Sequence, residues 1–498
     1  MPLLIACNGT SASADRDGPG SGGSAGGSSG GVTAAGGTST TGGLDATAGS
    51  SLATGGSLAT GGREPSGGAS QSGGQAATGG ATSGECLGET NGISATKIHY
   101  VSPTGTANNS GTSATSPLDF KSALAAVAPG ELILLEPGTY SIAYASGARN
   151  TIAFNTSGSS NKPISVVAAH CGRAVFDFSF PAGTWVQDSY GFYVTGTYWY
   201  FKGIDITHAG YQGAYVTGQY NTFENCAFYD NRNTGLEINE GGAYTTVKNC
   251  DSYRNYDPKK NGSMADGFGP KQTQGPGNKF IGCRSWENSD DAYDCYDSPE
   301  SVVFENCWAI RAGINYWNDA KFAGNGNGFK VGGNSKQANH RLTQCVSFGN
   351  VSKGFDQNNN TGGLTFYNCM AYSNGTNFGL GGVLSTGQQH VLENNISLGA
   401  SNSIANAIQS NNSWNTGFSV SSADFVSLDS SLATVARNPD GSLPRTALFR
   451  LVSTSELIDA GIDVGLPYAG NAPDLGAFEV TPQYPSPRVA GCPLVCGL

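Results

Sequence analysis

The sequence is poor in charge, in histidine and in long apolar runs. Only 13% of its 498 residues are charged, five are histidine, and acidic residues outnumber basic ones by 37 to 26. No run of about 18 apolar residues occurs, which argues against a membrane-spanning helix. The net charge of −11 argues against nucleic acid or an anionic membrane surface as a partner. The same charge makes an anionic substrate unfavourable unless a cation mediates.

The first part of the chain differs in composition from the rest. Residues 8–95 are dominated by Gly, Ser, Thr and Ala, so they are predicted to form a disordered linker without a core. Residues 1–7, "MPLLIAC", are similar to the end of a bacterial lipoprotein signal in which Cys7 is acylated. A chance apolar start is the alternative. The first interpretation predicts an extracellular or cell-surface lipoprotein of a bacterium, with folded structure over residues 96–480 and a tail over 481–498.

A repeat occupies the middle of the chain. Segments such as "TFENCAFYDN", "KFIGCRSWEN" and "LTFYNCMAYSN" place a cysteine in the same position. The six equivalent cysteines are Cys226, Cys250, Cys283, Cys307, Cys345 and Cys369. Their interval of 24 residues, stretched to 33 and 38 by insertions, and their short alternating runs favour strands of a solenoid. We therefore predict an all-β fold, a parallel β-helix in which the cysteines form an inward, reduced ladder.

Further columns follow from stacking the repeats. An asparagine lies five residues after five of the six cysteines, and side-chain amides stacked from rung to rung can hydrogen-bond, so a structural asparagine ladder is predicted. Phe120, Leu124 and Val127 have helical spacing, which predicts a short helix capping the N-terminal end of the coil. At the other end, "SELIDAGID" and "PDLGAFE" are predicted to form the last rungs.

Beyond each cysteine the repeats continue with a small residue, an aromatic residue or Leu, and then a variable position. In chain order the variable position holds Glu237, Gly269, Asp294, Lys330, Asp356 and Gly379. Insertions precede two of these positions, "DPKKNGSMAD" before Gly269 and part of "AGINYWNDAKFAGNGN" before Lys330. Loops inserted on one side of a solenoid are predicted to wall a groove.

Carboxylates gather on two neighbouring rungs of this column. Asp266 and Asp291 each lie three residues before a variable position, Asp290 is adjacent to Asp291, and Asp294 occupies the position itself. Four carboxylates in one patch repel unless a cation neutralises them, and oxygen-only ligands with uneven spacing suit Ca²⁺. The alternative is that aspartates merely decorate the turns of a β-helix. We predict that Asp266, Asp290, Asp291 and Asp294 bind Ca²⁺.

Lys330 lies in the column between two acids, next to the predicted metal site, and this position suits a general base. A nearby Ca²⁺ would favour its neutral form, whereas Asp356 would favour the charged form. Lys271 and Lys321 lie near the inserted loops and are candidates for substrate contact, as is Asp356. Arg284 and Arg311 are further candidates for carboxylate binding, and for each basic residue a plain surface charge is the alternative.

The motifs "ADGFGPK", "NSDDAYDCYD", "GNGNGFKVGG" and "GFDQNNN", in this order, resemble polysaccharide lyase family 9, the pectate lyases built on a right-handed parallel β-helix. The resemblance covers roughly residues 97–480. It implies four aspartates around one catalytic Ca²⁺ and a lysine as Brønsted base, here Asp266, Asp290, Asp291, Asp294 and Lys330. It also implies β-elimination on an α-1,4-linked galacturonan, an acidic plant polysaccharide, by a protein that we expect to be a monomer.

Three alternatives stay open. A glycosidase of the same fold would need two carboxylates and water, for which Asp294 and Asp356 are the available pair, but the aspartate cluster and Lys330 would then have no explanation. A non-catalytic protein would bind the polymer in a calcium-dependent way without cleaving it. Within the lyases, rhamnogalacturonan or another uronate polymer is a possible substrate.

Overall fold

The computed structural model describes residues 90–480. The predictions for the lipoprotein segment, for residues 8–89 of the linker and for the tail over 481–498 lie outside the described residues. Within residues 90–480 the protein is almost entirely β, with one α-helix, α1 (Phe120–Ala126), and three short 3₁₀ segments, Ala169–Cys171, Ser422–Asp424 and Ser430–Ala433. No helix among these residues is long and apolar enough to cross a membrane.

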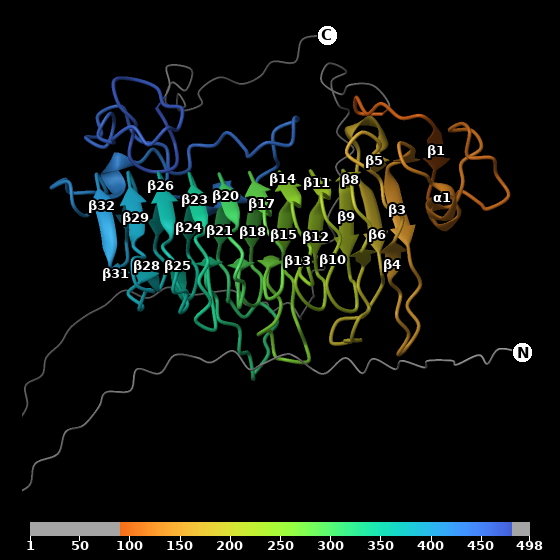
Figure 1. Ribbon diagram of the computed structural model, residues 1–498, viewed down its shortest axis with the longest axis horizontal. Coiled ribbons are helices and arrows are strands. Elements are labelled where there is room, and N and C mark those ends of the chain that lie inside the picture. Colours follow the sequence, from red (N-terminus) through yellow and green to blue (C-terminus); the bar gives the residue numbers. More distant parts are fainter. Residues whose placement is uncertain (1–89, 481–498) are drawn as a thin grey trace, which may run out of the picture. The chain divides into compact units, whose positions relative to one another are not determined.

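The strands form three parallel sheets that run side by side along the solenoid (Figure 1). The twelve-stranded sheet consists of β1 (Ile98–Val101), β2 (Leu132–Leu135), β5 (Ile164–Ala168), β8 (Trp199–Lys202), β11 (Thr222–Glu224), β14 (Thr246–Lys248), β17 (Lys279–Ile281), β20 (Val303–Glu305), β23 (Arg341–Thr343), β26 (Thr365–Tyr367), β29 (His390–Glu393) and β32 (Ala407–Ser410). A ten-stranded sheet, here called the site sheet, consists of β4 (Ile152–Phe154), β7 (Phe192–Val194), β10 (Ala214–Val216), β13 (Leu236–Ile238), β16 (Phe268–Pro270), β19 (Tyr293–Asp294), β22 (Phe329–Lys330), β25 (Lys353–Asp356), β28 (Thr376–Leu380) and β31 (Ser403–Ile404). The covered sheet, also ten-stranded, consists of β3 (Gly138–Ser141), β6 (Ala174–Asp177), β9 (Ile204–Thr207), β12 (Ala227–Tyr229), β15 (Asp251–Tyr253), β18 (Arg284–Trp286), β21 (Trp308–Ile310), β24 (Val346–Phe348), β27 (Met370–Tyr372) and β30 (Ile396–Leu398).

The interior of the coil is a stack of apolar side chains in register. Phe280 and Phe304 are paired between β17 and β20, and their ring centroids are 5.4 Å apart. The six repeated cysteines are buried and free, as predicted, and Cys295 joins them in the core. Because equivalent residues of successive rungs lie about 4.8 Å apart, one apolar position in the repeat builds a continuous core along the axis.

The predicted asparagine ladder is present. The side-chain amide of Asn231 donates to Oδ1 of Asn255 at 3.0 Å, and that of Asn255 donates to Oδ1 of Asn288 at 2.9 Å. The ladder is interrupted at Ala312, which has no side-chain amide, although its backbone N–H still donates to Oδ1 of Asn350. Each amide also satisfies backbone groups of a turn that would otherwise be buried without partners.

The N-terminal end of the coil is covered as expected. Asp119 caps α1 by accepting a hydrogen bond from the backbone N–H of Ser122 at 2.9 Å. Phe120 is buried, and its ring centroid lies 4.7 Å from that of Phe176 in β6. The helix therefore closes the apolar interior beside the first strands.

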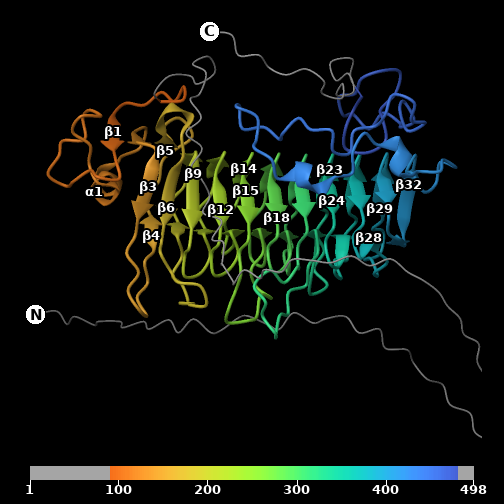
Figure 2. The ribbon, with the colours of Figure 1, turned by 180° about the vertical axis from the view of Figure 1, so that it is seen from behind.

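The prediction for the C-terminal end was wrong. The last strand is β32, and neither residues 455–463 nor residues 473–479 form a rung. Residues 411–480, here called the strap, turn back along the solenoid, as Figure 2 shows from behind. Leu457 and Leu475 of the strap pack in one apolar cluster with Trp308 and Val346 of the covered sheet. These apolar residues have the composition of strands, but they cover a sheet face instead of extending the coil.

Candidate metal centre and active site

The predicted column lies on the outer side of the site sheet. Strand pairing places Glu237 beside Gly269, and further along it places Asp294 beside Lys330 and Lys330 beside Asp356. The core side of the same strands is formed by buried aromatic residues such as Tyr293 and Phe329, whose rings stack at 4.5 Å. Since side chains alternate between the two faces of a strand, this aromatic stack holds the neighbouring polar positions outward.

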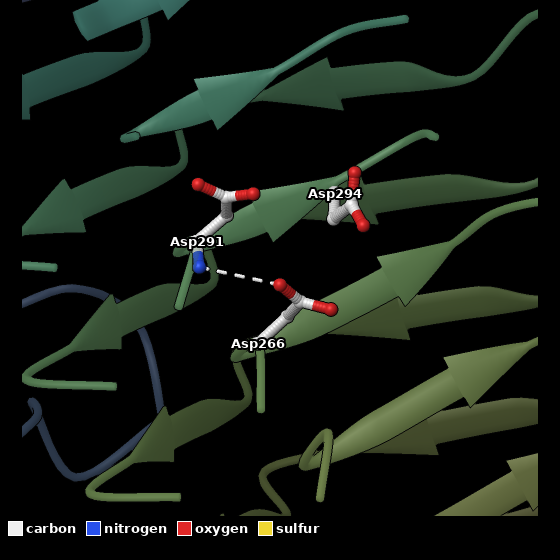
Figure 3. A group of neighbouring side chains, drawn as sticks. All are labelled: Asp266, Asp291 and Asp294. Atoms are coloured by element: carbon white, nitrogen blue, oxygen red, sulfur yellow. Dashed lines mark hydrogen bonds between the residues drawn. The ribbon is translucent and has the colours of Figure 1, made fainter. Parts of the chain in front are cut away.

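Three carboxylates converge on two adjacent rungs. Asp266, Asp291 and Asp294 each offer an oxygen, and these three atoms lie within 4.8 Å of one another (Figure 3). All three side chains are buried. The backbone N–H of Asp291 donates to Oδ1 of Asp266 at 3.2 Å, which ties the two rungs together.

A close backbone approach positions Asp266. The next residue, Gly267, has no Cβ, and a Cβ there would lie only 1.9 Å from Oγ of Ser285 in β18. Any other residue would push the end of the inserted segment away from the coil. Oδ2 of Asp266 accepts hydrogen bonds from Oγ1 of Thr234 at 3.1 Å and from Nζ of Lys271 at 2.8 Å.

Asp291 carries the least compensated carboxylate of the group. Its Oδ1 accepts hydrogen bonds from the backbone N–H and the amide of Asn327, at 2.8 and 2.9 Å. Its Oδ2 is buried and accepts no hydrogen bond of good geometry, although Nζ of Lys330 lies 3.1 Å away. Burial raises the pKa of Asp291 to about 7 despite the opposing effect of Lys330. Burial also raises the pKa of Asp294.

Lys330 is buried beside these acids. Its Nζ is 3.1 Å from Oδ2 of Asp291 and 3.5 Å from Oδ1 of Asp294. Burial lowers the pKa of the ammonium, but the nearby carboxylates, Asp291 first, raise it by more and leave it well above its ordinary value. In the free protein the lysine is therefore the counter-ion of the acidic cluster.

The residues present fit a hard divalent cation. The donors are carboxylate oxygens only, one of them has no hydrogen bond, and the pKa values of Asp291 and Asp294 are raised because burial leaves their charge poorly compensated. Such a set suits Ca²⁺, which takes oxygen ligands in flexible geometry. Softer metals prefer sulfur or imidazole, and neither is part of the group.

Comparison with known proteins places the chain in a family. Residues 99–395 match the family described as "Pel9A-like, right handed beta helix region". The chain belongs to this family.

Relatives and solved structures extend the match. Pectate lyase L of Dickeya dadantii (strain 3937) is 64% identical over 391 residues, which are 78% of this chain and 92% of that protein. Pectate lyase L of Paenibacillus polymyxa (strain SC2) is 33% identical over 371 residues, 69% of this chain and 79% of that protein. The crystal structure of pectate lyase Pel9A superposes with a TM-score of 0.79 at 63% identity, covering 80% of this chain and all of that one. A rhamnogalacturonan lyase superposes with a TM-score of 0.62 at 28% identity, covering 72% and 97%.

Membership of the Pel9A-like family confirms the right-handed parallel β-helix and the assignment to the polysaccharide lyases. The four predicted aspartates and Lys330 stay predictions as to their roles. Asp290 is not one of the three converging carboxylates, and its Oδ1 accepts a hydrogen bond from the backbone N–H of Asn325 at 2.6 Å. It is nonetheless buried, and burial together with Asp291 raises its pKa well above the usual range.

The three predicted substrate contacts lie in different surroundings. Nζ of Lys271 is 2.8 Å from Asp266, 3.5 Å from Asp294 and 4.0 Å from Glu237, so it neutralises the acidic cluster from the other side. Lys321 is exposed in the inserted loop. Asp356 accepts a hydrogen bond from Nζ of Lys353 at 2.8 Å, a partner that the sequence reasoning missed.

The two arginines suggested as carboxylate contacts are engaged elsewhere. Arg284 pairs with Asp251 at 2.8 Å and donates to the strap, at the carbonyls of Ala433 and Val435. Arg311 pairs with Glu287 at 2.9 Å and also contacts the strap. Both lie on the covered sheet side, so the suggestion was wrong. Asn327 and Thr234 were also missed, although each lies three residues before a column position, as Asp266 and Asp291 do.

Proposed function

We propose that the protein is a calcium-dependent pectate lyase that cleaves α-1,4-linked polygalacturonate by β-elimination. The observation that carries this proposal is the burial of three carboxylates against one lysine ammonium on the outer side of the site sheet. The names of the similar proteins, Pectate lyase L of Dickeya dadantii among them, support the same substrate class.

Asp266, Asp291 and Asp294 would hold the cation, and Asp290 is the fourth candidate ligand. When bound, Ca²⁺ would supply the positive charge that attracts a uronate carboxylate, makes its C5–H bond more acidic and lowers the pKa of Lys330. This charge also explains how a protein with a net charge of −11 can bind an anionic polymer. Lys271 would keep Asp266 and Asp294 in place by pairing with both.

Lys330 is the proposed Brønsted base. Its ammonium is held by Asp291 and Asp294 in the free protein, and those carboxylates would turn to the cation, which leaves Nζ free to act in its neutral form. Nζ accepts the proton from C5, the electron pair of that bond forms the C4–C5 double bond, and the C4–O bond breaks with its electrons leaving on oxygen. The product carries a 4,5-unsaturated uronate at its new end.

The test is to incubate the full chain with polygalacturonate at alkaline pH and follow the absorbance of the unsaturated product. We expect an absorbance rise that a chelator removes, that added Ca²⁺ restores, and that Lys330→Ala abolishes while Lys336→Ala, at an exposed lysine, does not. New reducing ends without absorbance would instead support a glycosidase that uses Asp294 and Asp356. Calcium-dependent binding with neither signal would support a binding protein.

The same assay should also be carried out with rhamnogalacturonan. The structural similarity to a rhamnogalacturonan lyase, with a TM-score of 0.62, favours rhamnogalacturonan as the alternative polymer for the same chemistry. An absorbance rise on that polymer and none on polygalacturonate would replace the substrate but keep the reaction.

A further inference from the structure

A cluster of aromatic rings lies on the N-terminal side of the carboxylates, and no step proposed above uses it. The aromatic platform is defined by Trp185, Tyr190, Tyr193, Tyr211 and Tyr215. The rings of Tyr190 and Tyr215 stack, with their centroids 4.6 Å apart and their planes 13° from parallel. The ring centroid of Tyr193 lies 5.1 Å from that of Tyr190. The ring centroid of Tyr211 lies 5.7 Å from that of Tyr190 and 5.2 Å from that of Trp185, which it contacts edge to face. Trp185, Tyr190 and Tyr193 each keep part of their surface exposed.

The platform continues the column that contains the carboxylates. Tyr193 of β7 is paired with Tyr215 of β10, Tyr215 with Glu237 of β13, and Glu237 with Gly269 of β16, the rung that carries Asp266. Tyr215 therefore lies two rungs before Asp266, about 10 Å along the axis at the spacing of parallel strands. A linear polymer that occupies the proposed active site and runs along the outer side of the site sheet would pass over these rings.

A lysine contacts the Trp185 end of the platform. Nζ of Lys259 lies over the Trp185 ring, 4.0 Å from its centroid, and Lys259 comes from the insertion that leads to Asp266. Asp188, the acid to which the Tyr190 hydroxyl donates, is paired with the exposed Arg149 at 2.8 Å. Lys259 is therefore the cation in contact with the rings, whereas Arg149 offsets the charge of Asp188, and the carboxylates Glu237 and Glu240 lie on the other side, near Tyr215. A cation at the Trp185 end of the platform favours a polyanionic chain there.

Partly exposed aromatic rings in contact with one another form an apolar surface whose hydration is unfavourable, and such surfaces often mark binding sites. Tyrosine and tryptophan combine an apolar face with a polar edge, so they suit ligands that are apolar on one face and carry hydroxyls around the rim, as pyranose rings do. A position one or more sugar units from the cleavage point adds binding energy without touching the reacting bond.

We propose that the aromatic platform, with Lys259, is a distal subsite that binds the same uronate polymer on the N-terminal side of the carboxylate cluster. The inference rests on the proposed function for the identity of the polymer. The subsite makes the enzyme favour long chains over the shortest substrate that it can cleave.

The experiment compares kcat/KM on long polygalacturonate with kcat/KM on the shortest cleavable oligogalacturonide, for the full chain and for Trp185→Ala, Tyr193→Ala and Lys259→Met. We expect the ratio of the two values to fall about threefold to tenfold in each platform variant, since aromatic and cation contacts of this kind are individually modest. The exposed residues Tyr468 and Lys121 provide the matched controls Tyr468→Ala and Lys121→Met, in which the ratio stays at the wild-type value.

Turnover of the short substrate reports folding, because a misfolded variant loses both activities together. Equal losses on both substrates, or an unchanged ratio, would overturn the subsite. If the wild-type protein cleaves neither substrate, the proposed function fails, and retardation by polygalacturonate in affinity electrophoresis tests the subsite by itself. Retardation that weakens in the platform variants but not in the controls would keep it, and retardation that is absent or the same in all variants would overturn it.

Discussion

Lys330 and Asp294 occupy neighbouring rungs of one column, as partners in the register between β22 and β19, and Nζ of the lysine lies 3.5 Å from Oδ1 of the aspartate. The pair is buried, so each charge depends on the other for compensation. Substitution of the proposed base or of this proposed metal ligand therefore leaves the other charge buried without one of its partners.

The first prediction concerns this dependence. Lys330→Met should reduce kcat by about 10² to 10⁴, the usual contribution of a general base. It should also destabilise the metal-free protein by about 3 kcal/mol, because buried carboxylates lose their counter-ion, and added Ca²⁺ should recover most of that loss. Lys336→Met is the control for both measurements. A variant that keeps kcat within tenfold of wild type would remove Lys330 from the chemistry.

The second prediction concerns the cation. Ca²⁺ at a hundredfold excess over its dissociation constant should stabilise the wild-type protein by about 2.7 kcal/mol, measured by thermal or denaturant unfolding. Asp291→Asn should lose this stabilisation, whereas Asp290→Asn should lose less, because Asp290 is outside the group of three converging carboxylates. Asp297→Asn is the control. Equal calcium titrations of wild type and Asp291→Asn would show that the ion binds elsewhere.

The third prediction concerns the asparagine ladder. Asn255 accepts hydrogen bonds from the backbone N–H and the amide of Asn231, at 3.1 and 3.0 Å, inside the coil. Asn255→Ala leaves these donors buried without a partner, which should cost about 1–3 kcal/mol in urea unfolding. Asn108→Ala, at an exposed position, should change stability by less than about 0.5 kcal/mol. A loss no larger than that of the control would mean that the ladder is not stabilising.

The fourth prediction is a pH dependence of stability. Nδ1 of the buried His340 accepts a hydrogen bond from the backbone N–H of Val302 at 3.0 Å, and burial lowers its pKa to about 4. Because the unfolded chain binds a proton near pH 6.5 and the folded chain does not, stability should fall as the pH drops from about 6.5 towards 4. This histidine alone should cost about 2 kcal/mol at pH 5 relative to pH 8.

The repeat position that holds His340, just before a strand of the twelve-stranded sheet, supplies the control. Asn278 makes the equivalent hydrogen bond, with its Oδ1 accepting from the backbone N–H of Thr245 at 2.8 Å. His340→Asn should keep an acceptor in place and reduce the slope of stability between pH 8 and pH 5. An unchanged slope would show that other groups cause the acid sensitivity.

The fifth prediction separates structural arginines from substrate contacts. Arg284 links Asp251 to the carbonyls of the strap from a buried position. Arg284→Met should destabilise the protein by about 3 kcal/mol, as expected when one partner of a buried pair is removed. KM for the polymer should stay at the wild-type value, and Arg341→Met at an exposed position is the control. A raised KM without loss of stability would restore Arg284 as a substrate contact.

Much of the fold could be predicted because a solenoid stacks residues that are one repeat apart in the sequence directly on one another. Once the cysteines are aligned, each repeat position becomes a column, and the register pairs Asp294, Lys330 and Asp356 as predicted. The asparagine ladder follows from the same alignment, including its interruption at Ala312. The period fails beyond the last repeat, and there the strap was mistaken for further rungs.

The sequence by itself determined the coil, its apolar interior and the patch on which Asp266, Asp291, Asp294 and Lys330 meet, because a constant rise per rung leaves equivalent residues no other place. Only the tertiary structure decided which way side chains turn within that patch: Asp290 towards Asn325, and Lys271 back towards Asp266. It also decided that the strap covers Arg284 and that Trp185 meets Lys259. Apart from the Lys271–Asp266 pair, whose members are five residues apart, these contacts join segments far apart in the chain. All of them depend on turn geometry and packing that no repeat period encodes.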